Sequence, residues 1–193
     1  MKKIVLAVFA VLVLCAAPAM YAQDHGEIGV YADYVRLHHA DNANFWGLGG
    51  RVGFNVHSHV QLEAEMSYDF EQSFTNTFTN GGTVTTTRTN LRLLHGMFGP
   101  RIQTNSGPVR AFVLLKGGFL NFSGNGGAAT IGNVGTQITG ITGGDTHAVF
   151  YPGGGVEFFA GPIGLRIEAG DLMYFANGAN NNLRLAIGPT FRF

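Results

Sequence analysis

Apolar and polar residues alternate with a period of two along most of the chain. In residues 60–70, for example, Leu62, Ala64 and Met66 occupy one parity while Glu63 and Glu65 occupy the other. Successive side chains of a β-strand point to opposite faces, so this alternation predicts strands with one apolar and one polar face. Eight such strands are expected, at residues 27–37, 45–57, 60–70, 87–102, 109–121, 146–159, 163–175 and 182–193.

The connections between these segments alternate between short and long. The second, fourth and sixth are the tight turns "HSH", "TNSGP" and "AGP". The first and seventh are "HHADNAN" and "ANGANNN", and the third and fifth are expected to be long loops around residues 72–86 and 122–145. Short turns at one end and long loops at the other are typical of an all-β, antiparallel, up-and-down transmembrane β-barrel with eight strands.

The first residues predict a cleaved signal peptide over residues 1–22, followed by a barrel domain over residues 23–193. Lys2 and Lys3 precede an apolar run that is too short for a membrane helix, and cleavage after Ala19 or after Ala22 fits the small residues there. Beyond this run no apolar stretch reaches the ~18 residues of a membrane helix. The only cysteine, Cys15, would leave with the signal, so no disulfide or thiol chemistry is expected.

Composition supports a membrane wall and excludes nucleic acid as a partner. Charged residues make up 12% of the chain, about half of the roughly 25% found in soluble domains. The 12 Lys and Arg residues balance the 12 Asp and Glu residues, so no basic field would attract DNA or RNA. The alternative is a soluble lipocalin-like barrel whose apolar face points inward.

In a membrane barrel the apolar parity faces lipid and the polar parity faces the lumen. Because hydrocarbon offers no hydrogen bonds, the last strand must pair with the first. An eight-stranded barrel is only wide enough for side chains to fill it, so the inward charges should pair and plug the lumen. The predicted lumen ion-pair network consists of Glu27, Asp33, Arg51, Glu63, Glu65, Asp69, Arg92, Arg110, Lys116, Glu157, Arg166, Glu168, Arg184 and Arg192.

Aromatic residues are expected to form a girdle at the strand ends next to the long loops. Aromatic rings are favoured at membrane interfaces. The residues that occupy this position on the outward parity are Tyr34, Trp46, Phe70, Phe119, Phe150 and Phe175.

The chain ends in "GPTFRF", which is similar to the β-signal of outer-membrane barrels, with Leu185, Ile187, Phe191 and Phe193 on one parity. Together with the signal peptide and the eight amphipathic strands, this ending resembles the OmpA/OmpX-type family of small outer-membrane β-barrels. The resemblance implies a monomer in the outer membrane of a Gram-negative cell, in contact with lipids and lipopolysaccharide. It also implies insertion by the barrel-assembly machinery, which would read the four terminal residues named above.

No catalytic, cofactor or metal site is expected. His57 and His59 have strand spacing but lie in a short turn, and His147 with Ser123 and Asp145 is the best triad that loop proximity offers. The sequence therefore predicts a non-enzymatic barrel with a structural role or a surface ligand bound by its outer loops. The alternatives are a lipid-A-modifying enzyme and a narrow passive channel.

Overall fold

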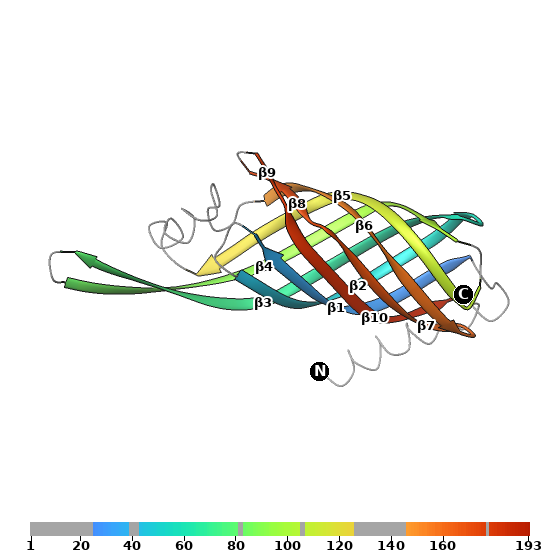
Figure 1. Ribbon diagram of the computed structural model, residues 1–193, viewed down its shortest axis with the longest axis horizontal. Coiled ribbons are helices and arrows are strands. Elements are labelled where there is room, and N and C mark those ends of the chain that lie inside the picture. The colour runs from blue at the N-terminus through green and yellow to red at the C-terminus, as the bar shows by residue number, and fades with distance from the viewer. Residues whose placement is uncertain (1–24, 39–42, 81–82, 105–106, 126–145, 177) are drawn as a thin grey trace, which may run out of the picture.

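A computed structural model describes residues 25–38, 43–80, 83–104, 107–125, 146–176 and 178–193. The predicted signal peptide lies outside these residues, as does most of the expected loop at 122–145. The described chain contains ten strands (Figure 1). We call each segment that crosses the barrel wall once a stave; β7 and β8, which both pair with β6, together form one stave. Their bounds are β1 Gly26–Leu37, β2 Ala43–His57, β3 Val60–Asn80, β4 Thr83–Gln103, β5 Val109–Asn125, β6 Thr146–Ala160, β7 Ile163–Asp171, β8 Met173–Phe175, β9 Ala179–Asn180 and β10 Asn182–Arg192.

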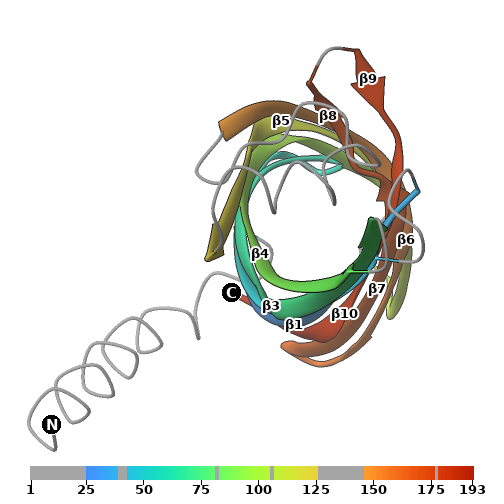
Figure 2. The ribbon, with the colours of Figure 1, turned by 90° about the vertical axis from the view of Figure 1, so that its left-hand side faces the viewer.

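The strands form a closed antiparallel barrel of eight staves. Each of β1 to β6 pairs with the next strand along the chain, and β10 pairs with β7 on one side and β1 on the other. The ring is visible end-on in Figure 2. At the seam, the backbone N–H groups of His25 and Gly26 both donate to the carbonyl of Phe193, at 2.8 and 2.9 Å. The predicted fold and the pairing of the last strand with the first are confirmed.

Short turns gather at one end of the barrel, which we call the short-turn end. They connect β2 to β3, β4 to β5, and β6 to β7. In the last of these, Gly161 has φ 68°, a left-handed conformation that glycine adopts without a Cβ clash. At the opposite, long-loop end, β8 and β9 form a small hairpin beside β6. None of the described residues forms a helix long and apolar enough to cross a membrane.

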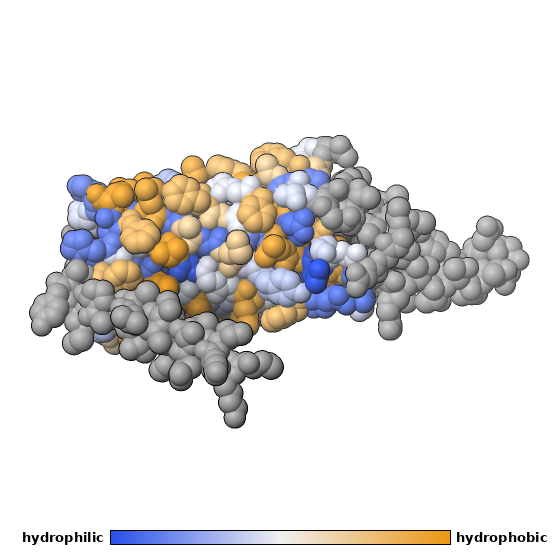
Figure 3. All heavy atoms as spheres, turned by 180° about the vertical axis from the view of Figure 1, so that it is seen from behind, coloured by the Kyte–Doolittle hydropathy of each residue, from blue (hydrophilic) through white to orange (hydrophobic). Residues whose placement is uncertain are grey.

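The outer wall carries the apolar parity. In β10, Leu183, Leu185 and Ile187 are 42 to 48% exposed, whereas Arg184 between them is fully buried. Apolar residues cover much of the wall in Figure 3. The predicted girdle residues Trp46, Phe70, Phe119, Phe150 and Phe175 are exposed on this wall, and Tyr34 is partly exposed beside Trp46.

The segment expected as a loop around residues 72–86 is instead a two-stranded ribbon. Strands β3 and β4 remain paired from Gln72 opposite Leu91 to Asn80 opposite Thr83, which extends them beyond the wall in Figure 1. The run is rich in threonine, whose β-branched side chain favours strands, and the sequence "NGG" at residues 80–82 is typical of a turn between two strands. Only residues 81–82 separate the two strands.

Strand β4 keeps one parity throughout, and its described ladders contain no bulge near His95 and Gly96. Its pairing with β3 shifts between Asp69 and Gln72, which places the irregularity in β3. Leu91, Leu93 and His95 therefore all face inward.

Candidate functional site in the barrel interior

The interior of the barrel has two layers. Toward the short-turn end it holds charged side chains, and toward the long-loop end it holds an apolar cluster. The change occurs within single strands: in β1, buried Asp33 is followed on the same face by buried Val35 and Leu37. The apolar layer includes Val35, Leu37, Ala43, Phe45, Leu91, Leu93, Leu120, Phe122, Val149, Leu172, Tyr174 and Ala176.

The charged layer contains seven buried carboxylates and six buried Arg and Lys side chains among the described residues. Such groups need partners, because an isolated charge in a dry interior is strongly destabilising. The carboxylates are Glu27, Asp33, Glu63, Glu65, Asp69, Glu157 and Glu168, and the cations are Arg51, Arg101, Arg110, Lys116, Arg166 and Arg184.

Several ion pairs run from one side of the wall to the other. Arg166 on β7 binds Glu63 on β3 through Nη1 and Nη2, at 2.5 and 3.1 Å; these strands lie opposite each other in the eight-stave ring. Lys116 on β5 binds Glu65 at 2.6 Å and also contacts Glu63. Glu63 and Glu65 on β3 are thus held by cations that cross the interior.

A second group of pairs links β10 and β2 to the same layer. Arg184 on β10 donates from Nε to Asp33 at 2.9 Å and from Nη1 to Glu65 at 2.6 Å. Arg51 on β2 donates to Glu168 on β7 at 2.9 Å. These contacts join five staves of the wall, β1, β2, β3, β7 and β10, through charged side chains.

Arg101 is a member of this layer that sequence reasoning missed. It is fully buried and donates to Glu27 at 2.7 Å and to Gln103 at 2.6 Å, and it also pairs with Glu157. Arg110 reaches the other oxygen of Glu27 at 3.3 Å. A constant parity for the strand at residues 87–102 would have found Arg101, but that parity also places leucines inside the barrel.

Aromatic rings lie against several of the buried guanidinium groups. Arg166 lies 4.2 Å from the ring centroid of Phe112, and Arg51 lies 4.2 Å from that of Tyr31. Arg184 lies 4.9 Å from the ring of Tyr151. Cation–π contacts of this kind strengthen when they are desolvated, so the rings add both packing and charge stabilisation.

Two of the residues predicted for the network lie elsewhere. Arg92 is exposed on the outer wall near the long-loop end of β4, because the interior at this level is apolar and Leu91 and Leu93 occupy the inward positions. A long cationic side chain near the end of a strand can extend its charge toward water. Arg192 is half-buried at the short-turn end, where its Nε donates to the carbonyl of Gly161 at 3.0 Å.

The residues considered for catalysis are not assembled into a triad within the described part of the chain. The ring of His147 packs against Phe122 and Tyr174, each with centroids 5.9 Å away, and its Nε2 has no hydrogen-bond partner there. Asp145 lies outside the described residues. His57 and His59 are exposed, with ring centroids 6.1 Å apart and Ser58 between them.

A closed barrel with an apolar outer wall and a buried charged interior defines the class of small membrane β-barrels. The sequence matches the family described as the outer membrane protein beta-barrel domain over residues 7–191. The chain belongs to this family, which places the protein in the outer membrane. A search of curated proteins found no similar sequence.

Two solved structures illustrate the likeness of fold. Neisserial surface protein A is 12% identical with a TM-score of 0.57, and the match covers 87% of this chain and 97% of the other. The attachment invasion locus protein Ail of Yersinia pestis, solved with the heparin analogue sucrose octasulfate, is 14% identical with a TM-score of 0.50, and the match covers 88% and 97%. At these identities the comparison concerns the fold alone.

Proposed function

We propose that the protein is a non-enzymatic outer-membrane barrel with a closed lumen, whose role is structural or is carried by the parts exposed at its long-loop end. The main support for a closed lumen is the set of ion pairs that cross the interior. An eight-stranded barrel has an interior only as wide as the side chains that fill it. Here the diametrically opposed strands β3 and β7 are bridged by Arg166 and Glu63, whose side chains cross the lumen at that level.

The apolar layer adds a second barrier above the charged one. Phe45, Leu93 and Phe122 are fully buried in it, from β2, β4 and β5. An ion would have to shed its hydration shell among these side chains, at a large desolvation cost. The two layers together argue against a passive channel.

The absence of a catalytic function is supported by the surroundings of the candidate residues. Nucleophilic catalysis requires a serine within hydrogen-bond reach of a base, whereas the ring of His147 lies against the aromatic rings of Phe122 and Tyr174. Lipid A from cells with and without the protein should have the same mass spectrum. A modification that depends on His147 would overturn this part of the proposal.

The surface role is supported by the β3–β4 ribbon. Strand β3 pairs with β2 only as far as Asp69 opposite Gly47, and β4 pairs with β5 only as far as Asn90 opposite Asn125. Beyond these positions β3 and β4 pair with each other, which gives the ribbon two strand edges that no other described strand covers. Such strand edges are suited to contact a surface ligand through their backbone groups.

The remaining partners follow from the family. The exposed apolar wall would contact lipid and, in the outer leaflet, lipopolysaccharide. Leu185, Ile187, Phe191 and Phe193 would form the signal read by the barrel-assembly machinery. The closed wall leaves no open strand edge within the membrane for a second copy to pair with, which is consistent with a monomer.

Conductance in planar bilayers tests the closed lumen. The purified full-length protein is inserted into a planar bilayer, and a general porin in the same bilayer serves as the positive control. We expect no sustained unit conductance, because charged side chains occupy the cross-section. Steady unitary currents that scale with salt concentration would contradict the closed lumen and favour the narrow channel.

A further inference from the structure

The charged layer contains one carboxylate that the ion pairs do not satisfy. Seven buried carboxylates face six buried Arg and Lys side chains. Asp69 is fully buried, and neither of its carboxylate oxygens has a hydrogen-bond partner among the described residues. An uncompensated buried carboxylate is strongly destabilising, so a positive group or a proton belongs at this position.

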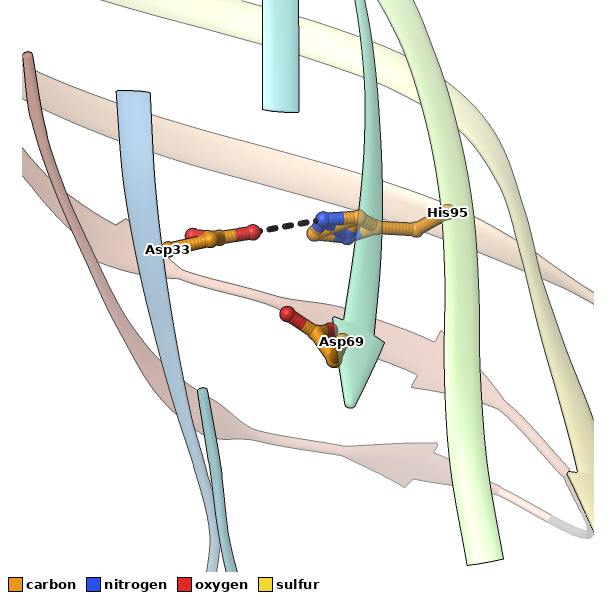
Figure 4. Close-up of side chains that lie close together, drawn as sticks. All are labelled: Asp33, Asp69 and His95. Atoms are coloured by element: carbon orange, nitrogen blue, oxygen red, sulfur yellow. Dashed lines mark ion pairs between the residues drawn. The ribbon is translucent and has the colours of Figure 1, made fainter. Parts of the chain in front are cut away.

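Asp69 lies beside two other potential metal ligands. Figure 4 shows Asp33 of β1, Asp69 of β3 and His95 of β4 converging in the interior. Nε2 of His95 lies 2.9 Å from Oδ2 of Asp33, and one ligand atom from each of the three residues lies within 4.8 Å of the other two. All three side chains are at most 1% exposed.

Gly47 on β2 creates the space in which the two aspartates meet. It pairs with Asp33 on one side and with Asp69 on the other, so the three residues occupy one level of the wall. A Cβ at Gly47 would overlap Oδ1 of Asp69 and the carbonyl of Tyr68. The missing side chain therefore allows two carboxylates from non-adjacent strands to face the same point.

We propose that Asp33, Asp69 and His95 bind a divalent transition-metal ion, with Zn²⁺ as the ion that best fits the ligands. Zinc binds imidazole nitrogen and carboxylate oxygen at about 2.0–2.2 Å with tetrahedral geometry, which places ligand atoms roughly 3.4 Å apart. The observed separations, 2.9 Å between His95 and Asp33 and at most 4.8 Å among the three residues, bracket this value. Calcium and magnesium prefer oxygen ligands throughout, so the imidazole favours zinc.

Arg184 is positioned to support such a site. Its Nε donates to Oδ1 of Asp33 at 2.9 Å, which leaves Oδ2 directed toward His95. Its Nη1 binds Glu65 at 2.6 Å, so the charge of the guanidinium is shared with a second carboxylate. Hydrogen bonds that orient a ligating carboxylate in this way are common around metal sites.

The second cluster of buried carboxylates contains no uncompensated charge. Glu63, Glu65 and Glu168 also lie within 4.8 Å of one another. Lys116 and Arg166 bind both oxygens of Glu63 between them, and Arg51 and Arg166 bind Glu168. Their charges are already compensated, so a metal ion has no role there.

The competing explanation is a single proton shared between Asp69 and Asp33. A neutral Asp69 would also remove the excess charge, but it would bind no metal and would tolerate replacement by asparagine. The metal site and the shared proton therefore predict opposite results in one experiment. Neither depends on whether the lumen conducts.

The experiment measures zinc in the refolded full-length chain. The protein is refolded from urea into detergent with Zn²⁺ present, so that the buried site fills as the barrel closes, and loosely bound metal is removed by a chelating resin. Mass spectrometry of the metal should give about one zinc per folded chain. Asp69→Asn and His95→Gln should each lower this at least tenfold, whereas the His57→Gln/His59→Gln control, which removes exposed imidazoles, should keep it.

Each outcome decides the question. A wild-type chain without stoichiometric zinc overturns the site, and this result needs no variant to fold. Equal zinc in the wild type, Asp69→Asn and His95→Gln would also overturn it. If Asp69→Asn folds without zinc and unfolds at a lower temperature than the zinc-loaded wild type, the metal site is supported.

Discussion

Replacing Arg166 with leucine should lower the free energy of unfolding of the barrel by about 3–5 kcal/mol, the range measured when one partner of a buried ion pair is removed. Arg166 holds Glu63 at 2.5 Å, Glu168 at 2.5 Å and Glu157 at 3.4 Å. Leucine would leave these carboxylates with less compensation in a dry interior. Urea unfolding of the folded protein in lipid, followed by the fluorescence of the single tryptophan, Trp46, measures the loss.

The matched control is Arg92→Leu. This substitution removes the same charge from an exposed position on β4 and should change the free energy of unfolding by about 0.5 kcal/mol or less. The double variant Arg166→Leu/Glu63→Leu should recover part of the loss, because a buried pair can be replaced by apolar residues at little cost. Equal losses for Arg166→Leu and Arg92→Leu would show that the interior pairs do not stabilise the barrel.

Gly188→Val should prevent the seam of the barrel from closing. Gly188 of β10 faces Tyr31 of β1, and a Cβ at this position would overlap the carbonyl of Val30 and approach the Cα of Tyr31. Because these are backbone atoms, β10 and β1 would have to separate to accommodate the valine. The expected cost is about 3 kcal/mol or more, at the upper end of overpacking effects. The folded band in unboiled gel samples should be strongly reduced or lost.

Gly50→Ala is the control for this prediction. A Cβ at Gly50 has only the carbonyl of Gly29 nearby, at 3.8 Å, which is ordinary van der Waals contact. The alanine should therefore leave the folded band unchanged. A Gly188→Val barrel that folds and resists heat as well as Gly50→Ala does would contradict the close approach at the seam.

The outer wall could be predicted from the sequence because lipid imposes one simple rule on it. Every outward position within hydrocarbon must be apolar, so the alternation in β3 around Leu62, Ala64 and Met66 gives its orientation directly. The seam followed from the same environment, since an unpaired strand edge is excluded there. These expectations needed no knowledge of which strands lie opposite one another.

The interior could be predicted only in part, because its polarity changes along the barrel axis. Charge marks the inward face of β4 at Arg101, but leucine marks it at Leu91 and Leu93. The expectation that all inward residues are polar therefore misplaced Arg92 and missed Arg101. Inward and outward residues alternate regularly along β4, but the prediction that placed Arg92 on the inward face was wrong.

The approach of Asp33 to Asp69 could not be predicted from the sequence. The two residues lie on β1 and β3, which are separated by β2, and their meeting depends on the register that places Gly47 between them. The partner of His95 on β1 likewise follows from the curvature of the closed wall. Sequence patterns give the face of each residue and leave the contacts across the barrel undetermined.

The central claim is that the apolar parity faces lipid while the charged parity faces the lumen. Tryptophan quenching by brominated lipids tests it most directly, in a Trp46→Phe background with one new tryptophan at Leu48, which is 61% exposed, or at Tyr151, which is fully buried. The account predicts strong quenching for Leu48→Trp and little for Tyr151→Trp. Stronger quenching at position 151 than at position 48 would contradict it.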